Sequence, residues 1–293
     1  MSDSIDCFCL IGGRGEFGRG AAWLTRSIRK FHPQTPIYVG IPTSETQSVT
    51  LRPSIELVPV KFPIREYPFS IQAALLKWVE SNTDHNTIAM IDSDALFVNK
   101  FEFRDRGRGI YIKPEGMIMH RYLNSGKFWR GCYDAVSLKP PSFREETTVT
   151  HRTCWPFYQA GIYVVSGLQI ADRLIEYTRA IWDHTERGDY FSEQIALSML
   201  ATELDQHRLP EAQNYPTDIR LYTPRSAQVI HYGSPERLLK AWTHGRLIAE
   251  VGALDHITAE YPGLALPKRF LWDLKCMAVN RARWRYLGDY GWE

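Results

Sequence analysis

Two aspartates separated by one residue, Asp92 and Asp94, stand between the apolar runs 87–91 and 95–98. In an extended chain, side chains at i and i+2 project from the same side, so the two carboxylates can converge on one cation. Carboxylate oxygens suit Mg²⁺ or Mn²⁺, which proteins commonly hold together with substrate phosphates. The triplet Asp92-Ser93-Asp94 therefore predicts a metal- and phosphate-binding site where a buried strand ends. The alternative is a solvated turn with two acidic residues.

The elements that must position this triplet alternate between short apolar runs and amphipathic helices. Helical periodicity predicts one helix that contains Leu24, Ile28 and Phe31, and further helices over 71–79, 170–182 and 192–204. Pro235 is a good first residue for another helix. Strands are expected at 5–11, 37–41, 55–60, 87–91, 95–98, 158–166, 219–222 and 227–231. This order predicts an α/β fold, a Rossmann-type, mixed and mostly parallel sheet with helices on both faces. Ligands of such sheets bind at the carboxyl ends of the strands.

The pattern breaks down between Asn99 and Trp155, where basic, glycine- and proline-containing stretches prevail. We interpret 99–155 as an inserted, partly irregular region that forms an acceptor-side wall or lid. The expected organisation is one domain over 1–265 and a basic, aromatic tail over 266–293.

Composition limits the partners and the compartment. The formal charge of +2 gives no general argument for nucleic acid, and none is expected as a partner. An acidic N-terminus and the lack of an apolar run of spanning length predict a cytoplasmic protein, either free in the cytosol or peripheral on the cytosolic face of a membrane. Five scattered cysteines without a CxxC pair argue against a disulfide framework or a structural zinc site. Cys7 and Cys9 are expected to be small buried side chains.

Four segments in sequence order resemble a known family. They are 90–98 around the aspartates, 158–166, 193–197 and 229–233. Their order and spacing are similar to those of GT-A nucleotide-sugar glycosyltransferases, and most nearly to the glycogenin-like retaining branch, family 8. The chain departs from that family in having Gln159-Ala160-Gly161 for an Asn-x-Gly motif, Glu193-Gln194 for Asp-Gln, and a compressed motif after His231.

The resemblance implies a role for each motif in binding a nucleotide-sugar donor. Asp92, Ser93 and Asp94 would bind Mn²⁺ or Mg²⁺ and the diphosphate, and His231 would be the third protein ligand, whose nitrogen favours Mn²⁺. The alternative for His231 is a hydrogen-bonded histidine near the surface. In the glycine-rich loop, Gly12 would let backbone approach the nucleotide while Arg14 donates to a phosphate or base, unless the loop is a plain tight turn.

Lys77 would reach a phosphate, or else is an exposed surface lysine. Glu193 and Gln194 would border the anomeric carbon, Gln194 with its amide dipole and Glu193 with hydrogen bonds to hydroxyls. If the reaction inverts the anomeric centre, Glu193 becomes the candidate base. The alternative for Glu193 is an acid favoured in the first turn of a helix. The strand segment Gln159, Ala160 and Gly161 would line the pocket floor, or Gly161 is a structural glycine.

The tail 266–293 interleaves basic and aromatic residues. Such a composition suits contact with an anionic membrane surface, and the alternative is a C-terminal helix packed on the domain. The sequence thus predicts an enzyme that moves a sugar from a nucleotide-sugar, expected to be a UDP-sugar, to a glycan, lipid-linked or protein hydroxyl. The rival hypotheses are a sugar-phosphate nucleotidyltransferase and a non-catalytic nucleotide- or carbohydrate-binding module.

Overall fold

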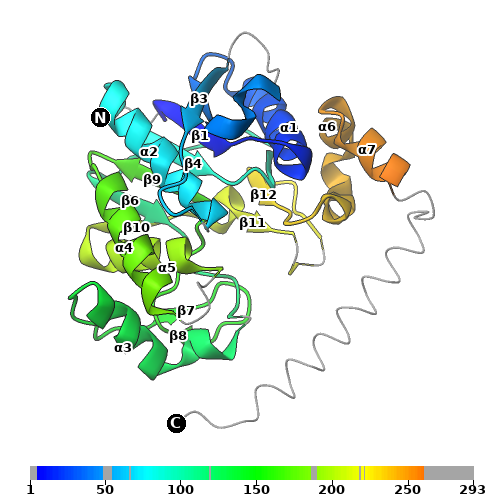
Figure 1. The fold of residues 1–293 in the computed structure, drawn as a ribbon. Helices are drawn as coiled ribbons and strands as arrows, with labels where there is room; N and C mark the ends of the chain where they lie inside the picture. Colours follow the sequence, from blue (N-terminus) through cyan, green and yellow to red (C-terminus); the bar gives the residue numbers. More distant parts are fainter. Residues whose placement is uncertain are drawn as a thin grey trace.

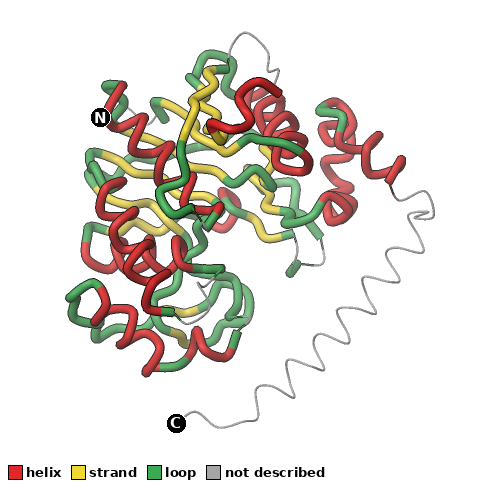
Figure 2. Tube along the Cα trace, viewed as in Figure 1, coloured by secondary structure: helices red, strands yellow, loops and turns green. Residues whose placement is uncertain are grey.

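The central element is a seven-stranded sheet with the strand order β10-β6-β9-β4-β1-β2-β3 (Figure 1 and Figure 2). The computed structural model describes residues 5–48, 55–65, 67–118, 120–185, 190–217, 219–220 and 222–260. The strands of this sheet are β1 (Cys7–Ile11), β2 (Ile37–Pro42), β3 (Glu56–Val60), β4 (Thr87–Ile91), β6 (Gly109–Ile112), β9 (Ile162–Ser166) and β10 (Gln206–Arg208).

Strand directions confirm the predicted mixed, mostly parallel sheet. β1 pairs in parallel with β2 and β4, β2 with β3, and β6 with β10. Only β9 runs against its neighbours, since it is antiparallel to both β4 and β6. Every residue of β1 and β4 is buried, as expected for central strands that are covered on both faces.

Helices cover the two faces of the sheet, as predicted. Cys7 and Cys9 face a core shared with α2, α4 and α5, whereas Phe8 and Leu10 face a core shared with α1. The alternation follows from the period of two along a strand. The helices are α1 (Gly15–Phe31), α2 (Ile71–Asn82), α4 (Ala171–His184) and α5 (Ser192–Glu203). Both cysteines are buried and free.

A second, three-stranded sheet is formed by β11 (Tyr215–Pro216), β12 (Val229–His231) and β5 (Ala95–Phe97). β12 is antiparallel to β5, and His231 lies opposite Ala95. This pairing brings His231, at the end of β12, beside the aspartate triplet. Beyond it, η5 (Pro235–His244), α6 (Gly245–Glu250) and α7 (Ala253–Glu260) follow, and they pack with β5 and β12 in a third apolar cluster. The helix expected from Pro235 is thus a 3-10 helix.

The prediction of a strand at 219–222 is wrong. The segment that pairs with β12 is Tyr215–Pro216, where Tyr215 lies opposite Ile230. Arg220 instead forms an ion pair with Glu211 (2.6 Å), and Tyr222 is exposed. The described residues of this segment, Ile219, Arg220 and Tyr222, therefore lie outside the sheet.

The expectation that 99–155 is an irregular insertion needs a correction at residues 109–112. β6 lies inside the main sheet between β9 and β10, and all four of its residues are buried. The basic residues at 104–108 conceal this strand in the sequence. The rest of the region carries η3 (Arg121–Asn124), α3 (Gly126–Ala135) and the hairpin of β7 (Glu145–Glu146) and β8 (Thr153–Cys154). Figure 1 shows α3 and this hairpin at the opposite end of the molecule from α1.

Three short 3-10 helices complete the architecture, η1 (Thr43–Ser48), η2 (Pro68–Ser70) and η4 (Glu211–Gln213). Within the described ranges, no helix has both the length and the apolar composition that crossing a bilayer requires. The predicted tail 266–293 lies outside the described residues.

Candidate functional site

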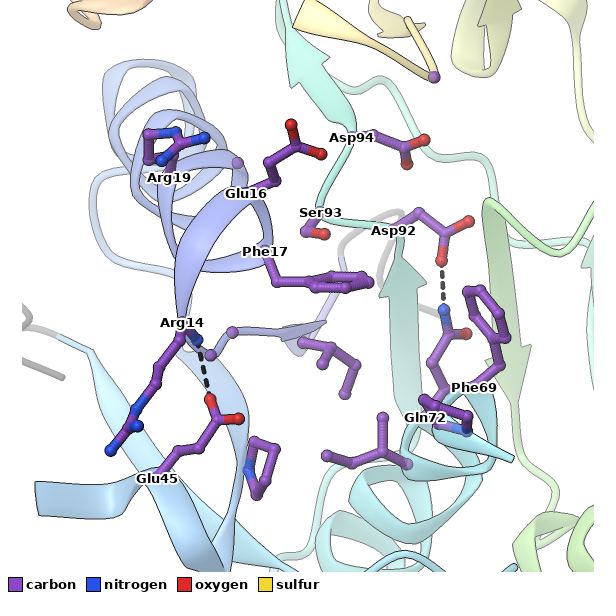
Figure 3. Close-up of a pocket in the computed structure, with 18 of the residues that line it drawn as sticks. Arg14, Glu16, Phe17, Arg19, Glu45, Phe69, Gln72, Asp92, Ser93 and Asp94 are labelled. Carbon is purple, nitrogen blue, oxygen red and sulfur yellow. Dashed lines mark hydrogen bonds between the residues drawn. The ribbon is translucent and has the colours of Figure 1, made fainter. Parts of the chain in front are cut away.

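The carboxyl ends of β1, β2 and β4 meet at one edge of the main sheet. The parallel register sets Leu10 opposite Ile91 and Ile11 opposite Gly40, so the loops that follow these strands lie together. These loops border a cavity of about 470 Å³ (Figure 3). Five of the predicted binding residues line this cavity, namely Gly12, Arg14, Asp92, Ser93 and Asp94. The site therefore occupies the position that the α/β pattern predicted.

Asp92, Asp94 and His231 converge at one side of this cavity. One ligand atom from each residue can be chosen so that all lie within 4.8 Å of one another. His231 Nε2 lies 3.1 Å from Asp94 Oδ1 and 3.9 Å from Asp92 Oδ2. Two carboxylates and an imidazole are a donor set that fits Mn²⁺, and also Mg²⁺ with more difficulty because of the nitrogen. The predicted ligand group is thus assembled by the fold.

Backbone hydrogen bonds fix the geometry of this group. The N–H of Asp92 donates to the carbonyl of Gly161 (2.8 Å), which ties the end of β4 to the start of β9. The N–H of Tyr232 donates to the carbonyl of Asp94 (2.9 Å), which continues the pairing of β5 with β12. The two sheets therefore hold together the aspartates and the imidazole, which come from two segments far apart in the chain.

The pKa values of the two aspartates are shifted in opposite directions. Burial, and then the charge of Asp94, raise the pKa of Asp92 to about 7. Burial also acts to raise the pKa of Asp94, but the charge and the hydrogen bond of His231 outweigh it and leave this pKa below its ordinary value. Near neutral pH the pair therefore shares a proton part of the time, and a divalent cation would compete with that proton.

The glycine-rich loop after β1 forms another wall of the cavity. A Cβ on Gly20 would lie 2.4 Å from the carbonyl oxygen of Ser93, so this glycine lets α1 approach the aspartate triplet. The backbone N–H of Arg14 donates to Glu45 Oε2 (2.8 Å). In Figure 3 the Arg14 side chain points away from Asp92 and Asp94. This loop thus lines the cavity with backbone atoms, while the guanidinium of Arg14 lies away from the two aspartates.

Phe17 projects from α1 into the cavity in Figure 3, and its side chain is 52% exposed. Tyr190, also 64% exposed, contributes to the same lining. Packing alone does not explain aromatic rings that are exposed in a concave site. Such rings suit a planar or ring-shaped ligand.

The segment Gln159, Ala160 and Gly161 lies behind His231. Gln159 Nε2 is 3.1 Å from His231 Nδ1. A Cβ on Gly161 would lie 2.4 Å from His231 Cε1, so the ring occupies the space that the glycine leaves open. Ala160 is almost fully buried. Among the described residues that line the cavity, none of these three appears; they support the histidine instead.

Glu193 and Gln194 begin α5, and they differ in environment. Glu193 is 3% exposed, and in the described part of the chain its Oε1 has no hydrogen-bond partner. Burial, and then the charge of Asp92, raise the pKa of Glu193 well above its ordinary value. Gln194 Nε2 donates to Glu115 Oε2 (2.9 Å). Neither belongs to the described lining of the cavity beside Asp92.

Lys77 is not brought to this site. Its ammonium group forms an ion pair with Asp172 at the surface, where its side chain is 51% exposed. This is the surface alternative that the sequence left open.

Three further residues reach the site without having been predicted. Gln72 donates to Asp92 Oδ1, Glu115 accepts from Gln194, and the charge of Arg237 lowers the pKa of Asp94. Gln72 left a signal, because it is a polar residue on the same buried helical stripe as Leu75 and Leu76. No periodic pattern marks Glu115 or Arg237, which depend on tertiary contacts.

Comparisons with known proteins identify a family and a fold for this chain. The model of the Rhodobacterales glycosyltransferase domain family matches residues 8–205, more than half of the chain. No curated protein matches the chain. Among solved structures, an active-site mutant of LgtC is similar with 14% identity and a TM-score of 0.52, over 83% of this chain and 94% of that one.

The galactosyltransferase LgtC in complex with donor and acceptor sugar analogues is similar with 15% identity and a TM-score of 0.52, over 87% of this chain and 99% of that one. At this level of identity the likeness concerns the fold. It confirms the GT-A-like α/β architecture that the sequence motifs predicted.

Proposed function

The chain belongs to the Rhodobacterales glycosyltransferase domain family, and on this premise we propose that it transfers a sugar from a nucleotide-sugar to a hydroxyl acceptor with Mn²⁺ or Mg²⁺. A UDP-sugar is the donor that we propose first. The observation that carries the proposal is the convergence of Asp92, Asp94 and His231 beside a cavity that is partly lined by a glycine-rich loop.

The residues around the aspartates can bind the diphosphate of the donor. Asp92, Asp94 and His231 would hold the cation, which when bound neutralises the charge that develops on the departing nucleoside diphosphate. The positive charge of Arg237 acts on Asp94 and would assist in the same place. From there the cavity extends between Gly12, Phe17 and Glu45, where it offers an aromatic ring and polar groups to a nucleoside.

The sugar would lie on the other side of the aspartates, towards α5. The hydrogen bond from Gln194 Nε2 to Glu115 fixes the amide of Gln194, and leaves its carbonyl oxygen as the end of the dipole available to a sugar carrying positive charge. Glu115 Oε1 in turn accepts from the N–H of Gly116 (2.7 Å). These contacts support a role for Gln194 beside the reacting carbon, with Glu115 as the residue that positions it.

Glu193 is less suited to act as the base of an inverting reaction. Its carboxyl group is buried, and burial and the charge of Asp92 raise its pKa, so it holds its proton to a higher pH than an ordinary glutamate, whereas a base must be deprotonated. The anomeric configuration of the product, measured by NMR, is the direct test of the stereochemistry.

The acceptor that we propose is a hydroxyl of a glycan, a lipid-linked sugar or a protein. A cytoplasmic location, with peripheral contact of the tail 266–293 to the cytosolic membrane face, is part of this proposal. Liposome binding should weaken when the residues after Pro267 are removed. Equal binding of the full chain and the truncated chain to anionic liposomes would refute the membrane contact.

The decisive experiment measures metal-dependent release of nucleoside diphosphate from a panel of nucleotide-sugars. We expect release with Mn²⁺, and a loss on the order of 10²-fold in Asp94→Asn, since the charge on the leaving group is then poorly neutralised. Asp84→Asn is the matched control, because Asp84 is exposed at the opposite end of β4. Nucleotide binding without turnover of any donor would favour the binding-module hypothesis instead.

A further inference from the structure

The cavity extends across the ends of neighbouring strands. In the order β4-β1-β2-β3, the aspartate triplet follows β4, the glycine-rich loop follows β1, and η1 with Glu45 follows β2. Neighbouring strands lie about 4.8 Å apart, so β2 lies roughly 10 Å from β4 along this edge of the sheet. A diphosphate held at the aspartates therefore directs the nucleoside of the donor towards Glu45.

Figure 3 shows the same separation. Phe17 lies between Asp94 and Glu45 in this view. The lining near Glu45 includes the apolar side chains of Pro42 and Phe62, while Arg14 directs its guanidinium away from Phe17. Among the described residues that line this end, Glu45 therefore offers the polar side chain best placed to meet the edge of a base.

The carboxylate of Glu45 is held in place by the loop that follows β1. Its Oε2 accepts from the backbone N–H of Arg14 (2.8 Å). A Cβ on Gly13 would lie 3.0 Å from the same oxygen and 3.9 Å from Cβ of Phe17. The carboxylate thus fills the space above this glycine, beside the base of the Phe17 side chain. A nucleobase that stacks on Phe17 meets an acceptor in a fixed position.

A carboxylate distinguishes nucleobases because it accepts hydrogen bonds and donates none. Its two oxygens provide about four acceptor positions, so a further donor can bind without displacing the N–H of Arg14. Uracil and guanine carry a ring N–H on their Watson–Crick edge, where cytosine and adenine have an unprotonated nitrogen. A ring N–H that faces the carboxylate forms a charge-assisted hydrogen bond, whereas a nitrogen lone pair in that position is left unsatisfied.

We propose that Glu45 selects the base of the nucleotide by accepting its ring N–H. This inference rests on the proposed function, because it needs the diphosphate at the aspartates. It names a base with a ring N–H, uracil or guanine, and rejects cytosine and adenine. A site built to hydrogen-bond a polar group discriminates strongly against a ligand that lacks this group. Uracil is the first candidate, in keeping with the UDP-sugar proposed above.

Nucleotide affinities, measured by titration calorimetry with Mn²⁺, test the proposal in two pairs. UDP and CDP share the ribose and the diphosphate and differ in the base alone, as do GDP and ADP. In the parent we expect the member with the ring N–H to bind about 10-fold to 100-fold more tightly than its partner in at least one pair. The pair that shows this preference identifies the base as a pyrimidine or a purine.

Variants of Glu45 should change this ratio of affinities. In Glu45→Gln the amide oxygen can still accept from Arg14 while the amide N–H donates to an unprotonated ring nitrogen, so the preference should disappear. Glu45→Asp keeps the carboxylate one carbon shorter and should retain a smaller preference of the same direction. Glu56→Gln is the control, since Glu56 is exposed at the beginning of β3 and should leave the ratio unchanged. Thermal unfolding establishes that each variant is folded.

The ratio within a pair separates base selection from mere support of the loop. If Glu45 only holds the loop through Arg14, Glu45→Gln weakens both members of a pair equally, and that result would overturn the inference. Equal affinity for both members of each pair in the parent would overturn it as well and leave the proposed function intact. A parent that binds none of the four nucleotides and releases none from nucleotide-sugars would refute the proposed function together with this inference.

Discussion

Gly161 lies directly against the imidazole of His231, so close that a Cβ on the glycine would be 2.4 Å from Cε1. The glycine immediately precedes β9 and gives the histidine access to the aspartates. Its role is therefore to provide space for the imidazole of the proposed metal site.

Replacing this glycine should disturb the metal site without unfolding the domain. We expect Gly161→Ala to displace His231 and to weaken Mn²⁺ binding by roughly 10-fold, an effect of the size seen when a ligand loses its support. Gly245→Ala is the control, because a Cβ there meets nothing within 4 Å. Isothermal titration with Mn²⁺ measures the difference, and unchanged affinity in Gly161→Ala would show that the ring does not depend on this space.

Metal affinity should rise with pH around neutrality. Burial and the charge of Asp94 raise the pKa of Asp92 to about 7, so a proton competes with the cation below that pH. We expect Mn²⁺ affinity to increase between pH 6 and pH 8 and then to level off. Affinity that does not change over this interval would contradict the raised pKa.

Glu193 should lower stability as the pH rises. Burial and the charge of Asp92 raise its pKa, so above the ordinary pKa of glutamate the folded state holds a proton that the unfolded state has lost. Each step up in pH then reduces the free energy of unfolding, until the folded-state pKa is passed. Glu193→Gln lacks this loss. The unfolding temperature of the variant, measured relative to that of the parent, should therefore increase from pH 5 to pH 8.

The exposed Glu176→Gln on α4 serves as the control for this comparison. A temperature difference between Glu193→Gln and the parent that stays constant with pH would mean that Glu193 ionises normally in the folded protein.

Glu115 and Gln194 should act as one unit in catalysis. The hydrogen bond between them (2.9 Å) fixes the amide, so Glu115→Ala should lower kcat more than it changes KM for the donor. In a double-mutant cycle with Gln194→Ala, the two losses should not add, because either change removes the same contact. Additive losses would assign the two residues to separate tasks.

Phe17 should contribute to nucleotide binding. Its ring is exposed and lines the cavity, and stacking of a base on an aromatic side chain contributes about 1–3 kcal/mol. We expect Phe17→Ala to weaken UDP binding by that amount, measured by titration calorimetry. Phe143→Ala is the control, since Phe143 is also exposed but is not among the described residues lining the cavity. Equal UDP affinity in both variants would remove Phe17 from the nucleotide site.

The sequence predicted the sheet class well because the strands that form the centre of the fold are short, apolar and regularly spaced. β1 and β4 are wholly buried, and the helices between them keep one apolar stripe. Prediction from the sequence failed where tertiary contacts, and not the local residue pattern, decide the secondary structure. β6 is hidden behind basic residues, and the apolar segment 219–222 has no strand partner among the described residues.

By itself the sequence determined the chemistry available to this protein, an acid pair at the end of a buried strand and a histidine at the end of another, because strand periodicity is a local property. Only the tertiary structure decided which groups meet. Antiparallel pairing of β5 with β12 brings His231 to Asp94, and burial near Asp92 sets the ionisation of Glu193. Distances and dielectric surroundings arise from segments far apart in the chain, so no local pattern could have specified them.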